Sequence, residues 1–281
     1  MKNQLIIFWL IACISFSPNS LIAQRIDSKI LKSGKIVTIH SKVLNQKREL
    51  FIYKPQIDIS CDAPLPVLYM MDSENIGMFA NIVDSSIING DFPPMIIVGI
   101  ANYKDERTKD LTPFPLGTNN SLGATKSGGG ELFLKFIKDE VIPLVNKEYK
   151  TTNEKILFGH SLGGLMSVYC LLNHPELFND YIPVSPSLWL ENDYLIQEAE
   201  TIFKIKNYIN KNIFISDGTE DPNLKVVQKF DSLLQKNKQS GLNYKYTSYE
   251  NETHNSQLVK AIPDGIRFII EKWKVSRKWK Y

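Results

Sequence analysis

Ser161 stands at the centre of the run G-H-S-L-G-G, with a glycine two positions away on either side. A short apolar run precedes this segment, and an apolar stretch with helical spacing, 165–172, follows it. Strand, sharp turn and helix with a serine at the apex form a nucleophile elbow, which presents the hydroxyl for attack on an acyl carbonyl. We expect Gly159 and Gly163 to provide room for the turn, and the Leu162 amide to bind the oxyanion. The alternative is a glycine-rich turn in which Ser161 only caps the helix.

Chain order selects the general base, because folds with this elbow carry the nucleophile, the acid and the histidine in that order. Of the four histidines, His40 and His160 precede Ser161, and His174 lies at the end of the helix that follows it. His254 comes late, in a polar segment between the last predicted strand and the last predicted helix. Histidine titrates near neutral pH, so we predict that His254 takes the proton from Ser161. The alternative is an ordinary histidine in a surface loop.

The acid of the triad should follow the predicted strand 212–216, where the sequence reads D-G-T-E-D-P. We predict Asp221 as the acid, with Glu220 and then Asp217 as the alternatives. Its task would be to fix the tautomer of the histidine and to stabilise the imidazolium. An acidic segment before a helix is also typical of a simple turn and cap.

A second oxyanion amide should come from the loop after the third strand. That loop is 72–75, and we expect the amide of Ser73 or Glu74 to be the donor. Its side chains could instead cap the helix predicted from Ile76.

The elements that must position these residues alternate along the chain. After an opening hairpin around Asn45, buried apolar runs alternate with stretches of helical spacing, which predicts one α/β domain with a mostly parallel sheet. The predicted strands are 36–39, 48–53, 67–71, 95–100, 155–158, 181–184, 212–216 and 244–249, and the predicted helices are 76–88, 131–149, 165–172, 192–205, 224–236 and 257–273.

The segment 101–130 breaks this alternation. It is polar, contains Pro113 and Pro115, and ends in three consecutive glycines. A connection of this length in a compact domain is usually functional or mobile. We therefore expect it to border the active site.

Bulk composition excludes several classes of function. The 281 residues include 33 basic and 30 acidic side chains, a formal charge of +3. This balance predicts neither a nucleic acid nor an anionic membrane as partner. The sequence has no Cys/His cluster with metal-ligand spacing and no H-E-x-x-H motif, so we predict no metal. Cys170 is predicted to be a buried apolar residue, and a disulfide with Cys61 is not expected.

The N-terminus has the features of an export signal. Lys2 is followed by an apolar stretch, 5–16, too short to span a bilayer comfortably, and Ala23 offers a cleavage position. We predict a signal peptide at 1–23 and a single domain at 24–281, and hence a periplasmic or secreted protein. The segment L-I-A-C resembles a lipobox, so lipid anchoring at Cys13 is the alternative. No other segment is long and apolar enough to span a membrane.

Several segments together resemble an esterase family of α/β-hydrolases that includes S-formylglutathione hydrolase, enterochelin-type siderophore esterases, feruloyl and acetylxylan esterases, and mycolyltransferases. The resemblance covers roughly 30–272 and is closest to the periplasmic siderophore-esterase branch. The matching segments are 67–72, Arg107 with 110–113, 128–129 with Phe133 and 142–143, the elbow, the run S-P-S-L-W at 185–189, and the loop at His254.

This resemblance implies an α/β-hydrolase fold with helices on both faces of the sheet, and an exported serine carboxylic-ester hydrolase without a cofactor. The family's G-x-x-D motif falls on 218–221 and favours Asp221 over Glu220. Ser73 departs from the family, in which many members have glycine there, and could narrow the pocket. A dyad of Ser161 and His254 without an acid stays open.

The implied substrate is a siderophore ester or an acylated or feruloylated glycan, and Trp189 would line its pocket or else lie in the core. Two other functions fit the same residues. In an acyltransferase an alcohol would resolve the acyl-enzyme in place of water. A non-catalytic binding protein would keep the fold alone.

Overall fold

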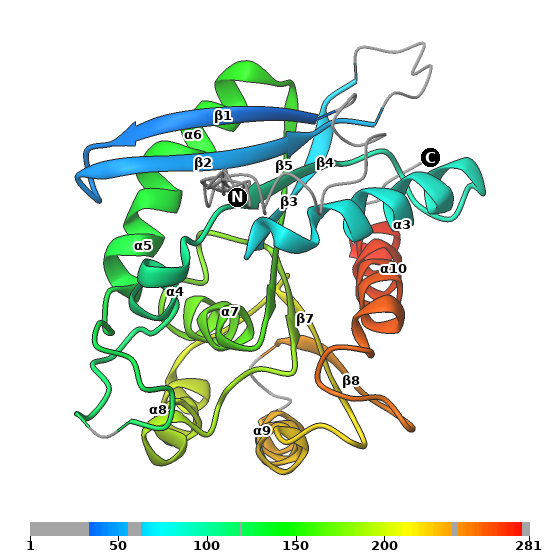
Figure 1. Ribbon diagram of the computed structural model, residues 1–281. Helices are drawn as coiled ribbons and strands as arrows, with labels where there is room; N and C mark the ends of the chain where they lie inside the picture. The colour runs from blue at the N-terminus through cyan, green and yellow to red at the C-terminus, as the bar shows by residue number, and fades with distance from the viewer. Residues whose placement is uncertain (1–33, 56–62, 119, 238–240, 277–281) are drawn as a thin grey trace, which may run out of the picture.

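Residues 34–55, 63–118, 120–237 and 241–276 are described by a computed structural model of the chain. Their strands form one eight-stranded sheet in the order β1-β2-β4-β3-β5-β6-β7-β8 (Figure 1). The strands are β1 (Gly34–Ser41), β2 (Gln46–Tyr53), β3 (Leu65–Met71), β4 (Ile96–Ile100), β5 (Thr151–His160), β6 (Asp180–Val184), β7 (Asn212–Gly218) and β8 (Asn243–Tyr249). Only the pairs β1–β2 and β2–β4 are antiparallel in this described sheet. The predicted α/β class, its N-terminal hairpin and its mostly parallel sheet are confirmed.

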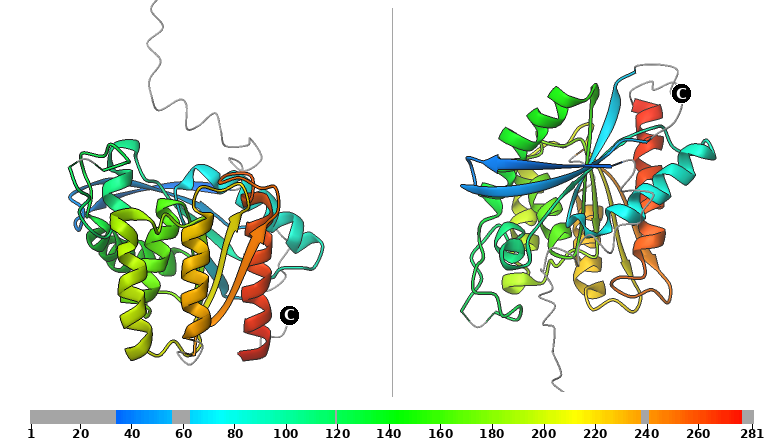
Figure 2. Two further views of the ribbon diagram at one scale, coloured as in Figure 1. Left: turned by 90° about the horizontal axis from the view of Figure 1, so that it is seen from below. Right: turned by 45° about the horizontal axis from the view of Figure 1, so that its top comes forward.

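Helices cover both faces of the sheet, and each face has its own apolar core. On one face α3 (Ile76–Ile88) and α10 (Leu258–Ser276) pack on side chains such as Leu68 and Met70. Their neighbours along β3, among them Tyr69, point to the opposite core, because successive side chains of a strand alternate between faces. Figure 2 (left) shows β7 and β8 between α9 and α10. The helices that cover the face to which Tyr69 points are α5 (Gly130–Phe136), the π-helix η2 (Ile137–Val141), α6 (Ile142–Glu148), α7 (Leu162–Asn173), α8 (Leu190–Ile205) and α9 (Leu224–Lys236).

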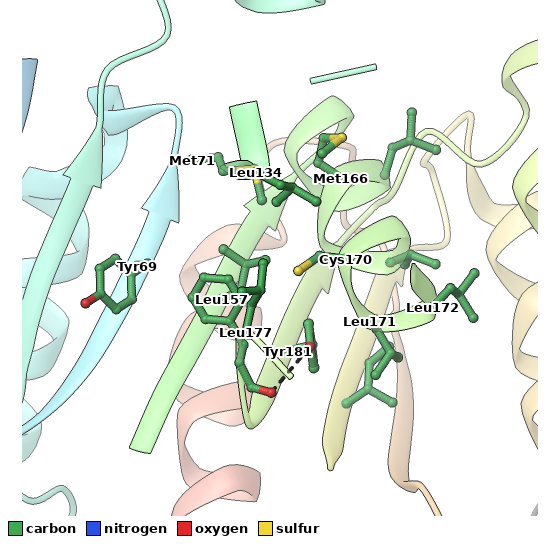
Figure 3. Packing of buried hydrophobic residues seen from close by; sticks show 14 of the residues in the cluster. Tyr69, Met71, Leu134, Leu157, Met166, Cys170, Leu171, Leu172, Leu177 and Tyr181 are labelled. Carbon is green, nitrogen blue, oxygen red and sulfur yellow. Dashed lines mark hydrogen bonds between the residues drawn. The ribbon is translucent and has the colours of Figure 1, made fainter. Parts of the chain in front are cut away.

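Burial on both faces explains why the strands could be predicted as continuous apolar runs. All seven residues of β3 and all five of β4 are buried. Helix α7, which follows the elbow, is also buried along most of its length, as expected of a helix that is apolar on all sides. Figure 3 shows Cys170 on α7 pointing toward Leu157, Leu177 and Tyr181. Cys170 is a free, fully buried thiol, and burial raises its pKa, so the predicted apolar role is confirmed.

Three helical segments differ from the sequence expectations. The segment 101–130 contains a helix, α4 (Lys104–Asp110), which the sequence did not predict. The helix predicted at 131–149 is divided by a π-helical turn. The helix predicted from 192 begins at Leu190, but Glu191, Asn192 and Asp193 have positive φ angles of 48°, 56° and 61°. Regular helical geometry therefore starts only after these three residues.

The predicted signal peptide, the alternative lipobox at Cys13, and Cys61 lie outside the described residues. Within the described ranges, no helix combines the length and the apolar character that crossing a membrane requires.

Candidate active site

Ser161 lies at the sharp turn between β5 and α7, with φ 59° and ψ −115°. Such a conformation costs a non-glycine residue about 1–3 kcal/mol and is concentrated at functional sites. A Cβ on Gly159 would lie 2.0 Å from the carbonyl oxygen of Gly163, so glycine is required there, as predicted. The expectation for Gly163 is wrong, because a Cβ there would make only ordinary contacts, the nearest at 3.4 Å from Met71. The second close approach is instead at Gly164, whose Cβ would lie 2.9 Å from Pro186 Cα.

The two amides predicted to bind the oxyanion each belong to the first residue of a helical element. Leu162 opens α7, and Ser73 opens the short 3-10 helix η1 (Ser73–Asn75) after β3. The loop after β3 reaches the start of α7, since a Cβ on Gly163 would lie 3.7 Å from Asp72 Oδ2. Neither the Leu162 nor the Ser73 amide donates a hydrogen bond to another described residue. Both amides are therefore available to a ligand.

The loop that carries Ser73 is held by one ion pair and a backbone hydrogen bond, and not by helix caps. Asp72 and Asn75 form no side-chain cap, so the capping alternative is wrong. Asp72 adopts φ 61°, and its carboxylate accepts two hydrogen bonds from Arg107 of α4, at 2.8 Å from Nε and 2.6 Å from Nη2. Its amide donates to Asn102 Oδ1 at 3.2 Å. The segment 101–130, which was predicted to border the active site, thus contacts the loop that carries Ser73.

His254 and Asp221 come together at the carboxyl ends of β7 and β8. The Nδ1 atom of His254 lies 3.2 Å from Asp221 Oδ1 and 3.4 Å from Oδ2. A glycine makes this approach possible, because a Cβ on Gly218 would lie 2.0 Å from the carbonyl oxygen of Glu252. The G-x-x-D spacing therefore has a physical reason: Gly218 admits the backbone of the histidine loop, and Asp221 then reaches the ring.

The Asp221 carboxylate is buried, with a side-chain exposure of 0%. Oδ1 accepts the amide of Asn223 at 2.8 Å, and Oδ2 accepts Nε2 of Gln257 at 2.8 Å. Burial alone would raise the pKa of Asp221, but hydrogen bonds from His254, Ser185 and Asn223 outweigh it and hold the pKa below its usual range. The carboxylate is thus prepared to remain ionised beside the ring.

The two alternative acids lie elsewhere. The side chain of Glu220 is exposed, and Asp217 accepts hydrogen bonds from Tyr246 at 2.8 Å and Ser248 at 2.5 Å. Burial raises the pKa of Asp217 to about 6. Within the described part of the chain, neither carboxylate forms a hydrogen bond or ion pair with His254. The geometry therefore favours Asp221.

Ser161 Oγ lies 3.3 Å from Ser187 Oγ, and among the described residues it forms no hydrogen bond with His254. Catalytic hydrogen bonds are often absent or long without substrate and tighten in the complex. Ser187 and Ser185, whose Oγ lies 2.7 Å from His254 Nδ1, both lie in the run that carries the family resemblance. The sequence did not lead us to predict the contact of Ser187 with Ser161 or that of Ser185 with His254, although the run S-P-S-L-W could have drawn attention to both serines.

His160, set aside as a base because it precedes Ser161, supports the histidine loop. Its Nε2 lies 2.8 Å from the carbonyl oxygen of His254. The two rings lie against each other, with centroids 4.4 Å apart. Burial, together with the neighbouring charge of His254, lowers the pKa of His160 to about 4. His160 is therefore neutral at physiological pH and can donate its Nε2 hydrogen to the His254 carbonyl.

This lowered pKa predicts a pH-dependent stability. Between pH 6.5 and 4 the unfolded chain binds a proton at His160 that the folded chain does not, so the free energy of unfolding decreases as pH falls through this window. A difference of about two and a half pKa units corresponds to roughly 3 kcal/mol. In urea titrations at pH 7 and pH 4, we expect wild type to lose roughly 2–3 kcal/mol more than His160→Gln.

The matched control is His40→Gln, since His40 is exposed on β1. It should reproduce the wild-type loss between the two pH values. Equal losses in wild type and His160→Gln would contradict a neutral, buried His160.

Trp189 borders an open pocket of about 470 Å³. One wall is formed by residues of the 101–130 segment, including Gly117 and Ser121, and the other by Trp189 and the residues up to Asn192. The walls are joined by a hydrogen bond from the amide of Gly117 to Glu191 Oε1 at 3.0 Å. Trp189 also packs on the apolar core, as the core interpretation expects, and whether its pocket binds substrate stays a prediction. In the described residues, no group of three or more His, Cys, Asp or Glu side chains could hold a metal ion.

Comparison with known proteins agrees with this architecture. Residues 41–264 match the family described as Putative esterase. A ferri-bacillibactin esterase of Bacillus subtilis, BesA, is 24% identical over 251 residues, which are 80% of this chain and 86% of that protein.

Solved structures have the same fold. An IroE-like serine hydrolase from Shewanella oneidensis superposes with a TM-score of 0.79 at 25% identity, over 88% of this chain and 83% of that one. The BES protein from Bacillus cereus, at 23% identity and a TM-score of 0.74 over 96% and 99% of the two chains, shares the fold. With its doubly covered, mostly parallel sheet and its match over 41–264, the chain belongs to the Putative esterase family of carboxylic-ester hydrolases with the α/β-hydrolase fold.

Proposed function

We propose that the protein is an exported serine esterase that hydrolyses siderophore esters through an acyl-enzyme, with Ser161, His254 and Asp221 as its triad. The proposal rests on the strained serine at the elbow, together with a histidine whose Nδ1 faces a buried carboxylate at 3.2 Å. The siderophore substrate is supported by relatives named as esterases of ferri-bacillibactin and of triacetylfusarinine C.

The reaction proceeds in two halves. His254 takes the proton of Ser161 as its oxygen attacks the ester carbonyl, and the amides of Leu162 and Ser73 hold the oxyanion. His254 then gives the proton to the leaving alcohol. In the second half a water, deprotonated by His254, attacks the acyl-enzyme and releases the acid. Asp221 stays ionised throughout and stabilises the imidazolium.

The pocket at Trp189 is the proposed site for the larger part of the substrate. Trp189, which lines the pocket, lies two residues after Ser187 in the sequence, and the Ser187 hydroxyl is 3.3 Å from Ser161 Oγ. A short stretch of chain therefore links the pocket to the proposed nucleophile. The aromatic ring of Trp189 would contact the substrate from one wall, and Gly117, Asn120 and Ser121 would contact it from the facing wall.

Export rests on the sequence of the N-terminus. The apolar stretch 5–16 and the small residue Ala23 support a signal peptide at 1–23, with one domain from 24 onward. Lipid anchoring at Cys13 is distinguished from cleavage by the mass of the N-terminal peptide of the exported protein.

The function is tested with the mature protein, residues 24–281. Hydrolysis of bacillibactin and triacetylfusarinine C, with and without iron, is followed by chromatography beside p-nitrophenyl acetate and butyrate. We expect turnover of at least one siderophore ester with a kcat/KM at least about tenfold above that of p-nitrophenyl butyrate. Turnover of simple esters alone would exclude these siderophores as substrates. Product appearing as a new ester when alcohols are added would indicate acyl transfer, and binding without turnover would indicate a non-catalytic protein.

A further inference from the structure

Three consecutive residues at the start of α8 have a left-handed backbone conformation. Glu191, Asn192 and Asp193 have φ angles of 48°, 56° and 61°, with ψ between 30° and 50°. Residues other than glycine visit this region as single residues and not in runs. Such strain persists only where the surrounding structure enforces it, and it is concentrated at active sites and ligand clamps. This turn is therefore a candidate for a functional role.

Two contacts tie the turn to distant parts of the chain. Oε1 of Glu191 accepts the amide of Gly117 at 3.0 Å, and Lys229 of α9 donates to Asp193 Oδ2 at 2.8 Å. The turn is thus held between the segment that follows α4 and helix α9, both of which lie beside α8 in Figure 1. These contacts fix where the Glu191 side chain lies.

The same turn forms one wall of the pocket at Trp189. This pocket has a volume of about 470 Å³ and is open to solvent. Of the described residues that line it, Glu191 is the one with a charged side chain, and the others, such as Asn120 and Ser121, are apolar or uncharged and polar. A ligand in this pocket therefore meets a carboxylate and no ammonium or guanidinium group among the described lining residues.

One oxygen of this carboxylate is left for a ligand. Oε1 of Glu191 is bound to the Gly117 amide, whereas Oε2 forms no hydrogen bond or ion pair with any described residue. A carboxylate accepts hydrogen bonds and donates none. It therefore binds hydroxyl and N–H groups and repels anions.

We propose that Glu191 is a specificity-determining residue, which selects substrates whose part in this pocket donates hydrogen bonds and carries no net negative charge. The proposal rests on the proposed function, in which the pocket at Trp189 receives the larger part of a siderophore ester. A ferric tris-catecholate is an anion, because each catechol gives up two protons to the iron. A metal-free catechol keeps its hydroxyl groups, and a ferric tris-hydroxamate is neutral. Glu191 thus favours metal-free catecholate esters and hydroxamate esters over ferric catecholates.

The competing influence is the set of cations in the segment 101–130. Lys109 and Lys126 share the carboxylate of Glu106, at 2.8 Å and 2.5 Å. If the field of these lysines dominated in the pocket, an anionic ligand would be preferred, and neutralising Glu191 would change little. The experiment must therefore remove the charge of Glu191 alone and compare ligands of different charge.

Glu191→Gln does this, because glutamine keeps the length of the side chain and an oxygen for the Gly117 amide. The matched control is Glu200→Gln, which neutralises another exposed carboxylate of α8, one that does not line the pocket. Both variants should keep the melting temperature of wild type, since exposed substitutions of this kind change stability little.

The probes are bacillibactin and triacetylfusarinine C, each with and without iron, and the measured quantity is kcat/KM of the mature protein. Wild type should prefer metal-free bacillibactin to its ferric form. In Glu191→Gln we expect the value for ferric bacillibactin to rise at least about threefold, since the repelling charge is gone. The value for metal-free bacillibactin should fall at least about threefold, because hydrogen bonds to a neutral acceptor are weaker.

The two changes have opposite signs, which a structural role of Glu191 would not produce. Loss of the pocket wall alone would lower both values together. Both forms of triacetylfusarinine C are neutral, so they should change in the same direction as each other. Glu200→Gln should keep the wild-type ratio for both siderophores. An unchanged ratio of ferric to metal-free bacillibactin in Glu191→Gln, or a wild type that prefers the ferric form, would overturn the proposal.

Binding separates this inference from the proposed function. Dissociation constants of both forms of bacillibactin are measured by titration calorimetry on Ser161→Ala and on Ser161→Ala with Glu191→Gln. Opposite shifts of the two constants, in a protein whose form with Ser161 hydrolyses no ester, would support selection by Glu191 and reject the proposed function. Siderophore hydrolysis with the same ratio in wild type and Glu191→Gln would do the reverse. A protein that neither binds nor hydrolyses these siderophores would reject both.

Discussion

Replacement of Ser161 by alanine is expected to reduce the hydrolysis of p-nitrophenyl butyrate roughly 10⁴- to 10⁶-fold, because it removes the proposed nucleophile of the acyl-enzyme. The remaining rate would come from the oxyanion amides and from substrate binding. His254→Ala should lose activity to a similar degree, and the double variant should be no worse than either single one, since nucleophile and base act as a unit. Steady-state kinetics on all three proteins checks this expectation.

A second replacement separates activity from stability at the same residue. Ser161 holds φ 59° and ψ −115°, a conformation that glycine adopts at little cost. Ser161→Gly should therefore be inactive yet more stable than Ser161→Ala, by roughly 1 kcal/mol in urea unfolding. Labelling with a fluorophosphonate, followed by intact-protein mass spectrometry, should modify wild type once and both variants not at all. Labelling or turnover retained in Ser161→Ala would show that a residue other than Ser161 is the nucleophile.

The sequence predicted the fold well where burial leaves a simple pattern. The run 67–71 is apolar throughout, and 213–215 forms the apolar centre of the strand predicted at 212–216, because both faces of these strands are covered. The helix at 224–236 was predicted with the bounds it has, because its apolar face recurs at helical spacing. Helix α4 was missed, since K-D-E-R-T-K-D has no apolar period. Its place is set by a contact far along the chain, that of Arg107 with Asp72.

Motif and chain order could predict only the three main residues of the candidate site. They pointed to Ser161, His254 and Asp221, and the geometry brings the latter two together. The surroundings were not predictable, because they depend on backbone detail. Ser185 meets a ring 69 positions away only because its φ is +44° and because Gly218 admits the histidine loop. The expectation for Gly163 was wrong for the same reason: which glycine is crowded depends on the approach of Pro186.

The second large effect concerns a buried ion pair linked through Asn102 to the loop that carries Ser73. Arg48 of β2 and Asp110 at the end of α4 have side-chain exposures of 0% and 1%, and Arg48 Nη1 lies 2.7 Å from Asp110 Oδ2. The same oxygen accepts Nδ2 of Asn102 at 3.2 Å, and Asn102 Oδ1 accepts the amide of Asp72. Burial raises the pKa of Asp110, which Arg48 and Asn102 oppose. Arg48 thus helps to fix the backbone that precedes Ser73.

Arg48→Met should lower the free energy of unfolding by about 3–5 kcal/mol, because Asp110 is left buried without its cation. Combining it with Asp110→Leu should recover most of this loss, since removing both charges also removes the cost of burying them. Urea unfolding of the single and double variants measures both values. A single variant as stable as wild type would show that the pair is not buried as described.

Measuring the activity of the double variant separates the contribution of this pair to stability from its effect on the candidate site. The double variant keeps a filled core but leaves Asn102 without the carboxylate that orients it. Since Asn102 binds the Asp72 amide, the Ser73 amide should be less well placed for the oxyanion. The stable double variant should therefore have a kcat reduced by roughly 10-fold with little change in KM, because an oxyanion contact acts in the transition state. Full activity in the stable double variant would mean that the contact of Arg107 with Asp72 is enough to hold the loop that carries Ser73.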